Sequence, residues 1–415
     1  MKVGIEPCPL TGSISAVSSK SDAHRILICA ALADKQTNIV LNGMSDDILA
    51  TAGCLCALGA KIARKEWGFE VCPIDIPQKE AVLDCGESGS TLRFLLPVAA
   101  ALGVKARFTG KGRLPERPIG HLKRVMEEHG VSFSSDKLPL EITGTLHAGE
   151  FELPGNISSQ YVTGLMLAIP LAGDSTIRLT TKLESAAYVD ITMSALEKFG
   201  VHIYAEEGRY TIARQKYISP LNIAAEGDWS NAAFFLAAGA LKGGVTVNGL
   251  DALSVQGDRA VADILKRFGA EISSDGGKVT VRPNSLKGCE IDVSGVPDLL
   301  PVLAAVAACA EGETRFVNAA RLRIKESDRL SAAAQMIKIL GGDAEELPDG
   351  LIVRGGELIG GTVDSFNDHR IAMAASVAAI SCKNEVKIVG AEAVNKSYPA
   401  FFEDYNSLGG KAYVL

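Results

Sequence analysis

Six glycines, spaced 68 to 72 residues apart, each follow a helix-like segment and precede a strand-like one. Before the fourth of them, Val261, Ile264, Leu265 and Phe268 repeat at the helical spacing i, i+3, i+4 and i+7. Glycine readily adopts the left-handed conformation that commonly ends a helix. The period therefore predicts six copies of one α+β unit of about 70 residues. The six glycines are Gly59, Gly130, Gly200, Gly269, Gly341 and Gly409.

A second landmark repeats in the same phase: a strand-like stretch, a polar turn, and an Ala- and Leu-rich helix. Each turn has one Ser or Asp at the expected N-cap, where its oxygen would accept a free N–H of the first turn. Helix N-termini of this kind also favour anions, and helices that are apolar nearly all round are expected to be buried. The period allows either one ring of six units or two groups of three. The predicted caps are Ser21, Ser90, Ser159, Ser230, Asp298 and Asp368.

The composition narrows the class of protein. Hydrophobic residues make up 47% of the chain, which excludes a disordered protein, and the net charge of −7 argues against a nucleic-acid partner. The nine cysteines form no CxxC pair, so we expect free thiols and no metal site. The start of the chain lacks a signal-peptide pattern, and the apolar run 299–310 is too short to span a membrane. We expect a cytoplasmic protein with no membrane partner.

A cluster of five charged or polar residues, 325–329, reads Lys-Glu-Ser-Asp-Arg. A salt-bridged surface face is one interpretation of such a cluster. In a helix, however, Lys325 and Arg329 would share one face, where like charges repel unless an anion lies between them. Arg and Lys are also the side chains that bind carboxylates and phosphates. The cluster therefore predicts an anion site as an alternative to a solvated face.

Taken together, six motifs resemble the enolpyruvyl transferase family, and within it the 5-enolpyruvylshikimate-3-phosphate synthases, over residues 13 to 398. The motifs are Lys20-Ser21-Asp22-Ala23-His24-Arg25, Gly89-Ser90-Thr91-Leu92-Arg93, Glu116-Arg117-Pro118-Ile119, Ser158-Ser159-Gln160, Lys325-Glu326-Ser327-Asp328-Arg329 and Phe366-Asn367-Asp368-His369-Arg370. The resemblance implies an α+β fold of two similar domains with a cleft between them. Each domain would hold three βαβαββ repeat units with buried helices, an inside-out α/β prism.

The implied domains are residues 1–19 plus 227–415, on the phosphoenolpyruvate side, and residues 20–226, on the shikimate 3-phosphate side. The implied reaction transfers the enolpyruvyl group of phosphoenolpyruvate to the 5-hydroxyl of shikimate 3-phosphate and releases phosphate through a tetrahedral intermediate. It belongs to the shikimate pathway of aromatic amino acid biosynthesis. The resemblance implies no metal or organic cofactor, domain closure on the two small-molecule substrates, and a monomer.

The resemblance also implies roles for individual residues. Asp298 matches the base that contacts the attacking hydroxyl, and Glu326 and Lys20 match the proton-transfer partners. The residues expected to bind shikimate 3-phosphate are Lys20, Ser21, Arg25, Ser158, Ser159, Gln160, Ser185, Asp298 and Lys325. Those expected to bind phosphoenolpyruvate are Lys20, Gly89, Arg117, Gln160, Arg329, Arg370 and Lys396.

Two alternatives remain beside this interpretation. A UDP-N-acetylglucosamine enolpyruvyl transferase would resemble this chain in fold, but typically carries a reactive cysteine on a loop that here, at residues 110–117, has none. A non-catalytic paralogue that binds phosphorylated metabolites would not need the acid–base residues Lys20, Asp298 and Glu326. The chain also departs from the family pattern at Arg321, where many members have an Asn that contacts the shikimate phosphate, so that role is not transferred.

Overall fold

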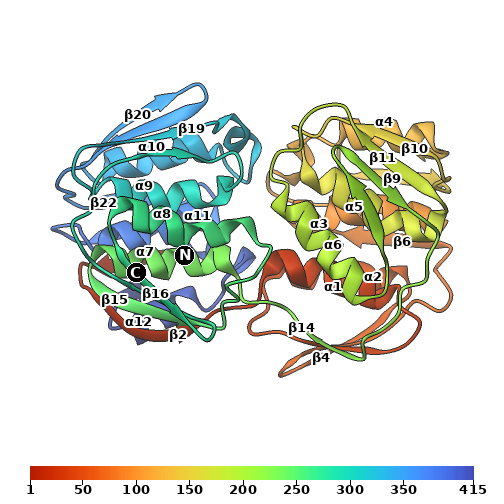
Figure 1. Ribbon diagram of the computed structural model, residues 1–415, viewed down its shortest axis with the longest axis horizontal. Helices are drawn as coiled ribbons and strands as arrows, with labels where there is room; N and C mark the ends of the chain where they lie inside the picture. The colour runs from red at the N-terminus through yellow and green to blue at the C-terminus, as the bar shows by residue number, and fades with distance from the viewer. The chain divides into compact units, whose positions relative to one another are not determined.

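The computed structural model describes residues 1–415, which divide into two compact units (Figure 1). Unit 1 comprises Met1–Ser19 and Glu226–Leu415, and unit 2 comprises Lys20–Ala225. Each unit holds three four-stranded mixed sheets and its own hydrophobic core. The predicted α+β fold with six repeats is confirmed, and the repeats group as two threes. No helix in the chain is long and apolar enough to cross a membrane.

Each sheet of unit 2 has two parallel strands joined to an antiparallel pair, in the orders β14-β3-β5-β4, β6-β7-β9-β8 and β10-β11-β13-β12. The helices are α1 (Lys20–Ala31), α2 (Asp46–Leu58), α3 (Gly89–Ala101), η1 (Leu114–Glu116), α4 (Gly120–Glu128), α5 (Ser159–Ala172) and α6 (Ala187–Lys198). The strands are β3 (Thr37–Val40), β4 (Lys61–Lys65), β5 (Gly68–Cys72), β6 (Glu80–Asp84), β7 (Lys105–Thr109), β8 (Val131–Phe133), β9 (Leu140–Gly144), β10 (Glu150–Leu153), β11 (Ser175–Leu179), β12 (Ile203–Glu206), β13 (Arg209–Ile212) and β14 (Asn222–Ala224).

The sheets of unit 1 have the orders β2-β15-β17-β16, β18-β19-β21-β20 and β22-β23-β1-β24. The helices are α7 (Trp229–Leu241), η2 (Gly257–Ala260), α8 (Val261–Phe268), η3 (Pro297–Leu299), α9 (Leu300–Ala307), η4 (Ala320–Ile324), α10 (Arg329–Ile339), α11 (His369–Ala379), η5 (Ala391–Lys396) and α12 (Phe401–Ser407). The strands are β1 (Lys2–Glu6), β2 (Leu10–Ser15), β15 (Gly243–Asn248), β16 (Glu271–Asp275), β17 (Lys278–Arg282), β18 (Glu290–Asp292), β19 (Glu313–Val317), β20 (Asp343–Leu347), β21 (Gly350–Arg354), β22 (Gly361–Asp364), β23 (Val386–Val389) and β24 (Lys411–Val414).

Two strands, β2 and β14, do not join the sheet of the repeat whose helix they precede in the sequence. Strand β2 runs directly toward α1 but pairs in parallel with β15, whereas β14 runs toward α7 but pairs in parallel with β3. The two connecting segments bond to each other: the Ser19 N–H donates to the Glu226 carbonyl at 2.7 Å, and the Asp228 N–H to that of Val17 at 2.8 Å. The chain therefore leaves and re-enters unit 1 at one hydrogen-bonded place.

All six repeat glycines have positive φ, between 72° and 122°, at the ends of α2, α4, α6, α8, α10 and α12. Each precedes a strand, as the period predicts, because glycine turns the chain out of the helix without a Cβ clash. The predicted N-caps are correct only at Asp368. The observed caps elsewhere are Ser88, Ser158 and Asp228, so Ser90, Ser159 and Ser230 lie within the first helical turn.

The helices predicted to be buried form the core of each unit. In unit 1, nearly every residue of α7, α9 and α11 is buried, and in unit 2 the same holds for α1, α3 and α5. Helices α3 and α5 approach closely at Gly164, where a Cβ would lie 2.2 Å from the Arg93 carbonyl oxygen. The first turns of α1, α3, α5 and α11 carry six of the candidate site residues: Lys20, Ser21, Gly89, Ser159, Gln160 and Arg370.

Candidate active site

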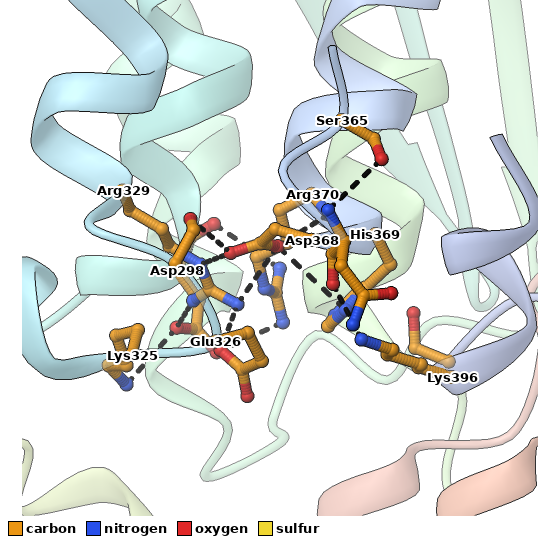
Figure 2. Close-up of polar contacts among 12 residues, drawn as sticks. Asp298, Lys325, Glu326, Arg329, Ser365, Asp368, His369, Arg370 and Lys396 are labelled. Atoms are coloured by element: carbon orange, nitrogen blue, oxygen red, sulfur yellow. Dashed lines mark hydrogen bonds and ion pairs between the residues drawn. The ribbon is translucent and has the colours of Figure 1, made fainter. Parts of the chain in front are cut away.

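Asp298, in the η3 turn before α9, lies among three cationic side chains of unit 1 (Figure 2). Its Oδ1 is 3.3 Å from Lys325 Nζ and 2.7 Å from Arg329 Nη1, and its Oδ2 is 3.0 Å from Arg370 Nη2. Lys325 follows η4, while Arg329 and Arg370 belong to the first turns of α10 and α11. Two neighbouring repeats, the fifth with Asp298, Lys325 and Arg329 and the sixth with Arg370, thus place one carboxylate against three cations.

The charge state of Asp298 follows from these neighbours. Burial alone would raise the pKa of Asp298, but Arg370, Lys325 and Arg329 hold that pKa well below its usual range. Burial lowers the pKa of Lys325, and the Asp298 carboxylate opposes that effect. Asp298 is therefore ionised at neutral pH. An incoming phosphate or carboxylate would compete with it for the cations.

Arg329 is the most buried of these cations, with 1% of its side chain exposed. Besides Asp298, its Nε donates to Asp368 Oδ2 at 2.7 Å and its Nη2 to Glu326 Oε2 at 2.5 Å. Burial would lower the pKa of Arg329, but the carboxylates of Asp368, Glu326 and Asp298 raise it well above its ordinary value. Asp368 also caps α11 by accepting the Arg370 N–H. One guanidinium therefore joins carboxylates from three segments.

The segment 325–329 is not a helix, which corrects the prediction that Lys325 and Arg329 share a helix face. The Asp328 side chain accepts from the Ser331 N–H at 3.1 Å, so α10 begins only at Arg329. The anion predicted to separate the two like charges is nevertheless present within the chain. It is Asp298, whose Oδ1 contacts both cations.

Lys396 is held beside the turn that leads into α11. Its Nζ donates to the Asn367 carbonyl oxygen at 2.5 Å. Phe366 and Asn367 in this turn have φ of 52° and 54°, a left-handed conformation that non-glycine residues rarely adopt. Strain of this kind concentrates at functional sites. The turn thus places Lys396 near the N-terminus of α11, which also carries Arg370.

A second buried carboxyl, Asp258, belongs to the η2 turn and is 6% exposed. The preceding Gln256 fixes this turn against α7: its Oε1 accepts the Trp229 N–H at 3.1 Å, and its Nε2 donates to the Gly227 carbonyl at 2.8 Å. Burial and the Asp298 carboxylate raise the pKa of Asp258 to about 6, while Arg370 opposes them. Asp258 therefore titrates well above an ordinary aspartate.

This shift predicts a pH-dependent stability. Because the folded-state pKa of Asp258 is raised, its contribution to stability is present below pH 4 and is lost as pH rises through 6. Asp258→Asn removes this pH-dependent loss of stability, because asparagine does not ionise. We expect the free energy of unfolding of the variant, relative to the original chain, to rise by about 2–3 kcal/mol between pH 4 and pH 7. Urea unfolding at both pH values measures this free energy. If the difference in free energy of unfolding between the variant and the original chain stays constant with pH, the pKa assigned to Asp258 is wrong. Asp275→Asn, at an exposed aspartate, provides the control.

In unit 2, the first two turns of α1 carry Lys20, Ser21 and Arg25. Lys20 Nζ forms an ion pair of 2.9 Å with Asp47 Oδ2, at the start of α2. The buried Arg25 donates from Nε to Thr192 Oγ1 on α6 at 2.8 Å. These bonds fix the two cations of the first motif on α1, Lys20 against the start of α2 and Arg25 against α6.

The N-terminus of α5 provides the serines and the glutamine of the fourth motif. Ser158 caps the helix by accepting the Gln160 N–H, and Ser159 is buried in its first turn. Gln160 Oε1 accepts from Arg93 Nη1 at 2.7 Å, and Gln160 Nε2 donates to Ser90 Oγ at 3.0 Å. The predicted residue Ser185, just before α6, is buried and has a φ of 54°.

Gly89 opens α3 beneath two guanidinium groups. A Cβ on Gly89 would lie 2.6 Å from Nη1 of both Arg117 and Arg93. Only glycine allows both groups to approach the helix N-terminus so closely. Two adjacent guanidiniums at a helix N-terminus are suited to binding an anion.

The predicted site residues fall into two groups. Unit 1 contains Asp298, Lys325, Glu326, Arg329, Arg370 and Lys396, and unit 2 contains Lys20, Ser21, Arg25, Gly89, Arg117, Ser158, Ser159, Gln160 and Ser185. The sequence pattern gives no binding or catalytic role to Asp47, Arg93, Asp258 or Asp368. Asp368 was interpreted only as a cap, and the pairing of Asp47 with Lys20 joins two helices, so no local spacing signals it.

Comparison with known proteins decides the family. A family model described as EPSP synthase (3-phosphoshikimate 1-carboxyvinyltransferase) matches residues 5–405. The chain belongs to the EPSP synthase family. Proteins named 3-phosphoshikimate 1-carboxyvinyltransferase from Clostridium acetobutylicum and Clostridium kluyveri are each 44% identical to it, over 99% of this chain and 98% and 97% of theirs.

Solved structures agree with this membership. An EPSP synthase from Acinetobacter baumannii matches with a TM-score of 0.84 and 27% identity, over 100% of both chains. The enolpyruvyl transferase NikO from Streptomyces tendae matches with a TM-score of 0.78 and 18% identity, over 99% of this chain and 98% of that one, which indicates a shared fold. Membership of the EPSP synthase family makes the alternative UDP-N-acetylglucosamine activity the less supported one.

Proposed function

We propose that the chain transfers the enolpyruvyl group of phosphoenolpyruvate to the 5-hydroxyl of shikimate 3-phosphate and releases phosphate. The observation that carries the proposal is the contact of the Asp298 carboxylate with Lys325, Arg329 and Arg370. A base set among anion-binding groups suits a reaction in which an alcohol attacks a doubly anionic substrate. The names of the 44% identical relatives support the same activity.

In the addition step, the 5-hydroxyl attacks C2 of phosphoenolpyruvate, its proton passes to Asp298, and C3 gains a proton. Glu326 and Lys20 are assigned to proton transfer at C3. The low pKa of Asp298 makes it a weak base in the free protein. When the substrate's carboxylate and phosphate engage Arg329 and Arg370, those cations are shared with other anions, which raises the basicity of Asp298.

The elimination step removes the C3 proton and expels phosphate from the tetrahedral intermediate. A leaving phosphate develops negative charge, which fixed cations stabilise without reorganisation. We assign Arg117, Arg329, Arg370 and Lys396 to phosphoenolpyruvate, together with Lys20, Gly89 and Gln160. We assign Ser21, Arg25, Ser158, Ser159, Ser185 and Lys325 to shikimate 3-phosphate, again with Lys20, Gln160 and Asp298.

The nine free thiols fit a reducing compartment, so we place the reaction in the cytoplasm. We propose a monomer as the active form. We therefore expect the specific activity to stay constant when the protein is diluted, whereas that of an obligate oligomer would fall. Specific activity measured over a wide range of protein concentration tests this.

The decisive experiment measures phosphate release with both substrates, with each alone, and with UDP-N-acetylglucosamine in place of shikimate 3-phosphate. We expect release only with phosphoenolpyruvate and shikimate 3-phosphate together, in equal amount to the enolpyruvyl ether formed. Release with UDP-N-acetylglucosamine would favour the alternative transferase. Binding of both substrates without release at micromolar protein would identify a non-catalytic paralogue.

Gly89→Ala tests the phosphoenolpyruvate assignment in unit 2. The new methyl group collides with the guanidiniums of Arg117 and Arg93, which are the ends of side chains and not backbone, so the helix itself need not unfold. We expect the KM for phosphoenolpyruvate to rise by about tenfold or more. Gly120→Ala, where a Cβ meets nothing within 4 Å, is the matched control. An unchanged KM in the Gly89 variant would remove this residue from the site.

A further inference from the structure

Arg93, to which no role in the reaction is assigned above, is among the most constrained side chains of unit 2. It is 3% exposed, and its Nη1 and Nη2 donate to Gln160 Oε1 at 2.7 Å and to the Pro118 carbonyl at 3.1 Å. Its guanidinium carbon lies 5.8 Å from the ring centre of Tyr161. The Tyr161 hydroxyl donates to the same Pro118 carbonyl at 2.6 Å. The guanidinium is thus fixed by two segments besides its own helix.

The contact decides which end of the Gln160 amide faces which neighbour. Arginine has donors and no acceptor, so the atom facing Arg93 must be the carbonyl oxygen of the amide. The amide nitrogen is then turned toward Ser90, to which it donates at 3.0 Å. An amide nitrogen has two N–H groups. In this orientation the second N–H of Gln160 can donate to an anion. In the reversed orientation the NH2 group of Gln160 would face the N–H donors of Arg93.

The backbone enforces this arrangement. Helices α3 and α5 cross at Gly164, where any side chain would collide with the carbonyl oxygen of Arg93. Because the backbone of Arg93 is the point of closest approach, its Cα lies at a fixed distance from helix α5, and the hydrogen bonds described above place the guanidinium. Pro118 also directly follows Arg117, so Arg93 holds the end of the segment that carries a phosphoenolpyruvate ligand of the proposed function.

We propose that Arg93 is a positioning residue that orients the Gln160 amide so that its N–H groups face the substrate. The inference rests on the proposed function, in which Gln160 binds both substrates. Arg93 acts through Gln160 and need not touch either substrate. Its effect depends on the fork of the guanidinium, which donates in two directions at once, and the single ammonium of a lysine does not reproduce that geometry.

A double-mutant cycle tests the inference with kcat/KM for phosphoenolpyruvate as the readout. We expect Arg93→Lys to lower kcat/KM by about 10- to 100-fold, even though it keeps the charge. In a Gln160→Ala background the same substitution should lower it further by less than about threefold, because the group that Arg93 orients is already absent. Arg64→Lys, on the exposed strand β4, is the matched control.

A second variant keeps the test informative if Arg93→Lys fails to fold, as judged by circular dichroism. Gln160→Glu still accepts from Arg93 but offers no N–H donors, so we expect it to lower kcat/KM more than Gln160→Ala does. Wild-type kcat/KM in Arg93→Lys, equal losses in both backgrounds, or Gln160→Glu retaining activity would each overturn the role of Arg93. Absence of phosphate release from the unmodified protein would instead overturn the proposed function.

Discussion

Asp298→Asn is expected to lower kcat for phosphate release by about 10²- to 10⁴-fold, the range typical of losing a general base. The substitution preserves size but removes the negative charge that Lys325, Arg329 and Arg370 surround. Lys325 and Arg370 then lose this internal anion, while Arg329 keeps Asp368 and Glu326, so binding of phosphoenolpyruvate should not weaken. Steady-state phosphate release at varied substrate concentrations separates the two effects, because kcat falls while KM stays equal or decreases.

The control for this experiment is Asp275→Asn, the same change at an exposed aspartate of unit 1. It should leave both constants unchanged. A higher KM with an unchanged kcat in Asp298→Asn would mean that the carboxylate only organises the cations, and its assignment as the base would be wrong. A variant as active as the original chain would remove Asp298 from the chemistry altogether.

Arg329→Met is expected to destabilise unit 1 by about 3–5 kcal/mol, the usual cost of removing one partner from a buried ion pair. Methionine approximates the length of arginine but leaves Asp298, Glu326 and Asp368 without their shared guanidinium. Unfolding in urea can be followed for unit 1 alone. The chain has two tryptophans, Trp67 in unit 2 and the buried Trp229 in unit 1, so a Trp67→Phe background reports on Trp229.

Arg354 provides a matched control, since it also contacts three carboxylates, those of Glu313, Asp343 and Glu345, but is 41% exposed. Arg354→Met should cost no more than about 1 kcal/mol, because exposed ion pairs contribute little. Equal losses in the two variants would show that burial does not distinguish them. A stable Arg329→Met variant would contradict the view that these carboxylates depend on Arg329 for neutralisation.

The sequence predicts the local geometry of each repeat better than the pairing of its strands. The glycine period locates the ends of six helices, because a positive φ strongly selects glycine at each end. The glycine period does not indicate that β2, which precedes α1 of unit 2, pairs with β15 of unit 1, or that β14, which precedes α7 of unit 1, pairs with β3 of unit 2. Each strand still precedes a helix with the same spacing, so a local pattern cannot reveal which sheet it joins.

The site could be predicted in residue identity but not in geometry. The cluster 325–329 indicated an anion site, yet helical spacing gave the wrong backbone, since the Asp328 cap starts α10 four residues later than assumed. The contact between Lys20 and Asp47 joins residues of separate helices. The carboxylate of Asp298 meets Arg370 across 72 residues of chain. Such contacts depend on helix packing, which the charge pattern of one segment does not encode.

The hydrogen-bonded crossing at Ser19 and Glu226 makes unit 2 an insertion within unit 1. Residues 20–225 include β14 and therefore hold every strand of their own three sheets. The Ser19 N–H already donates to the Glu226 carbonyl at 2.7 Å, and joining Ser19 directly to Glu226 would leave unit 1 with β1 and β2 in place. Each unit can thus be encoded as one continuous polypeptide, so that binding of phosphoenolpyruvate and of shikimate 3-phosphate can be measured for each unit separately.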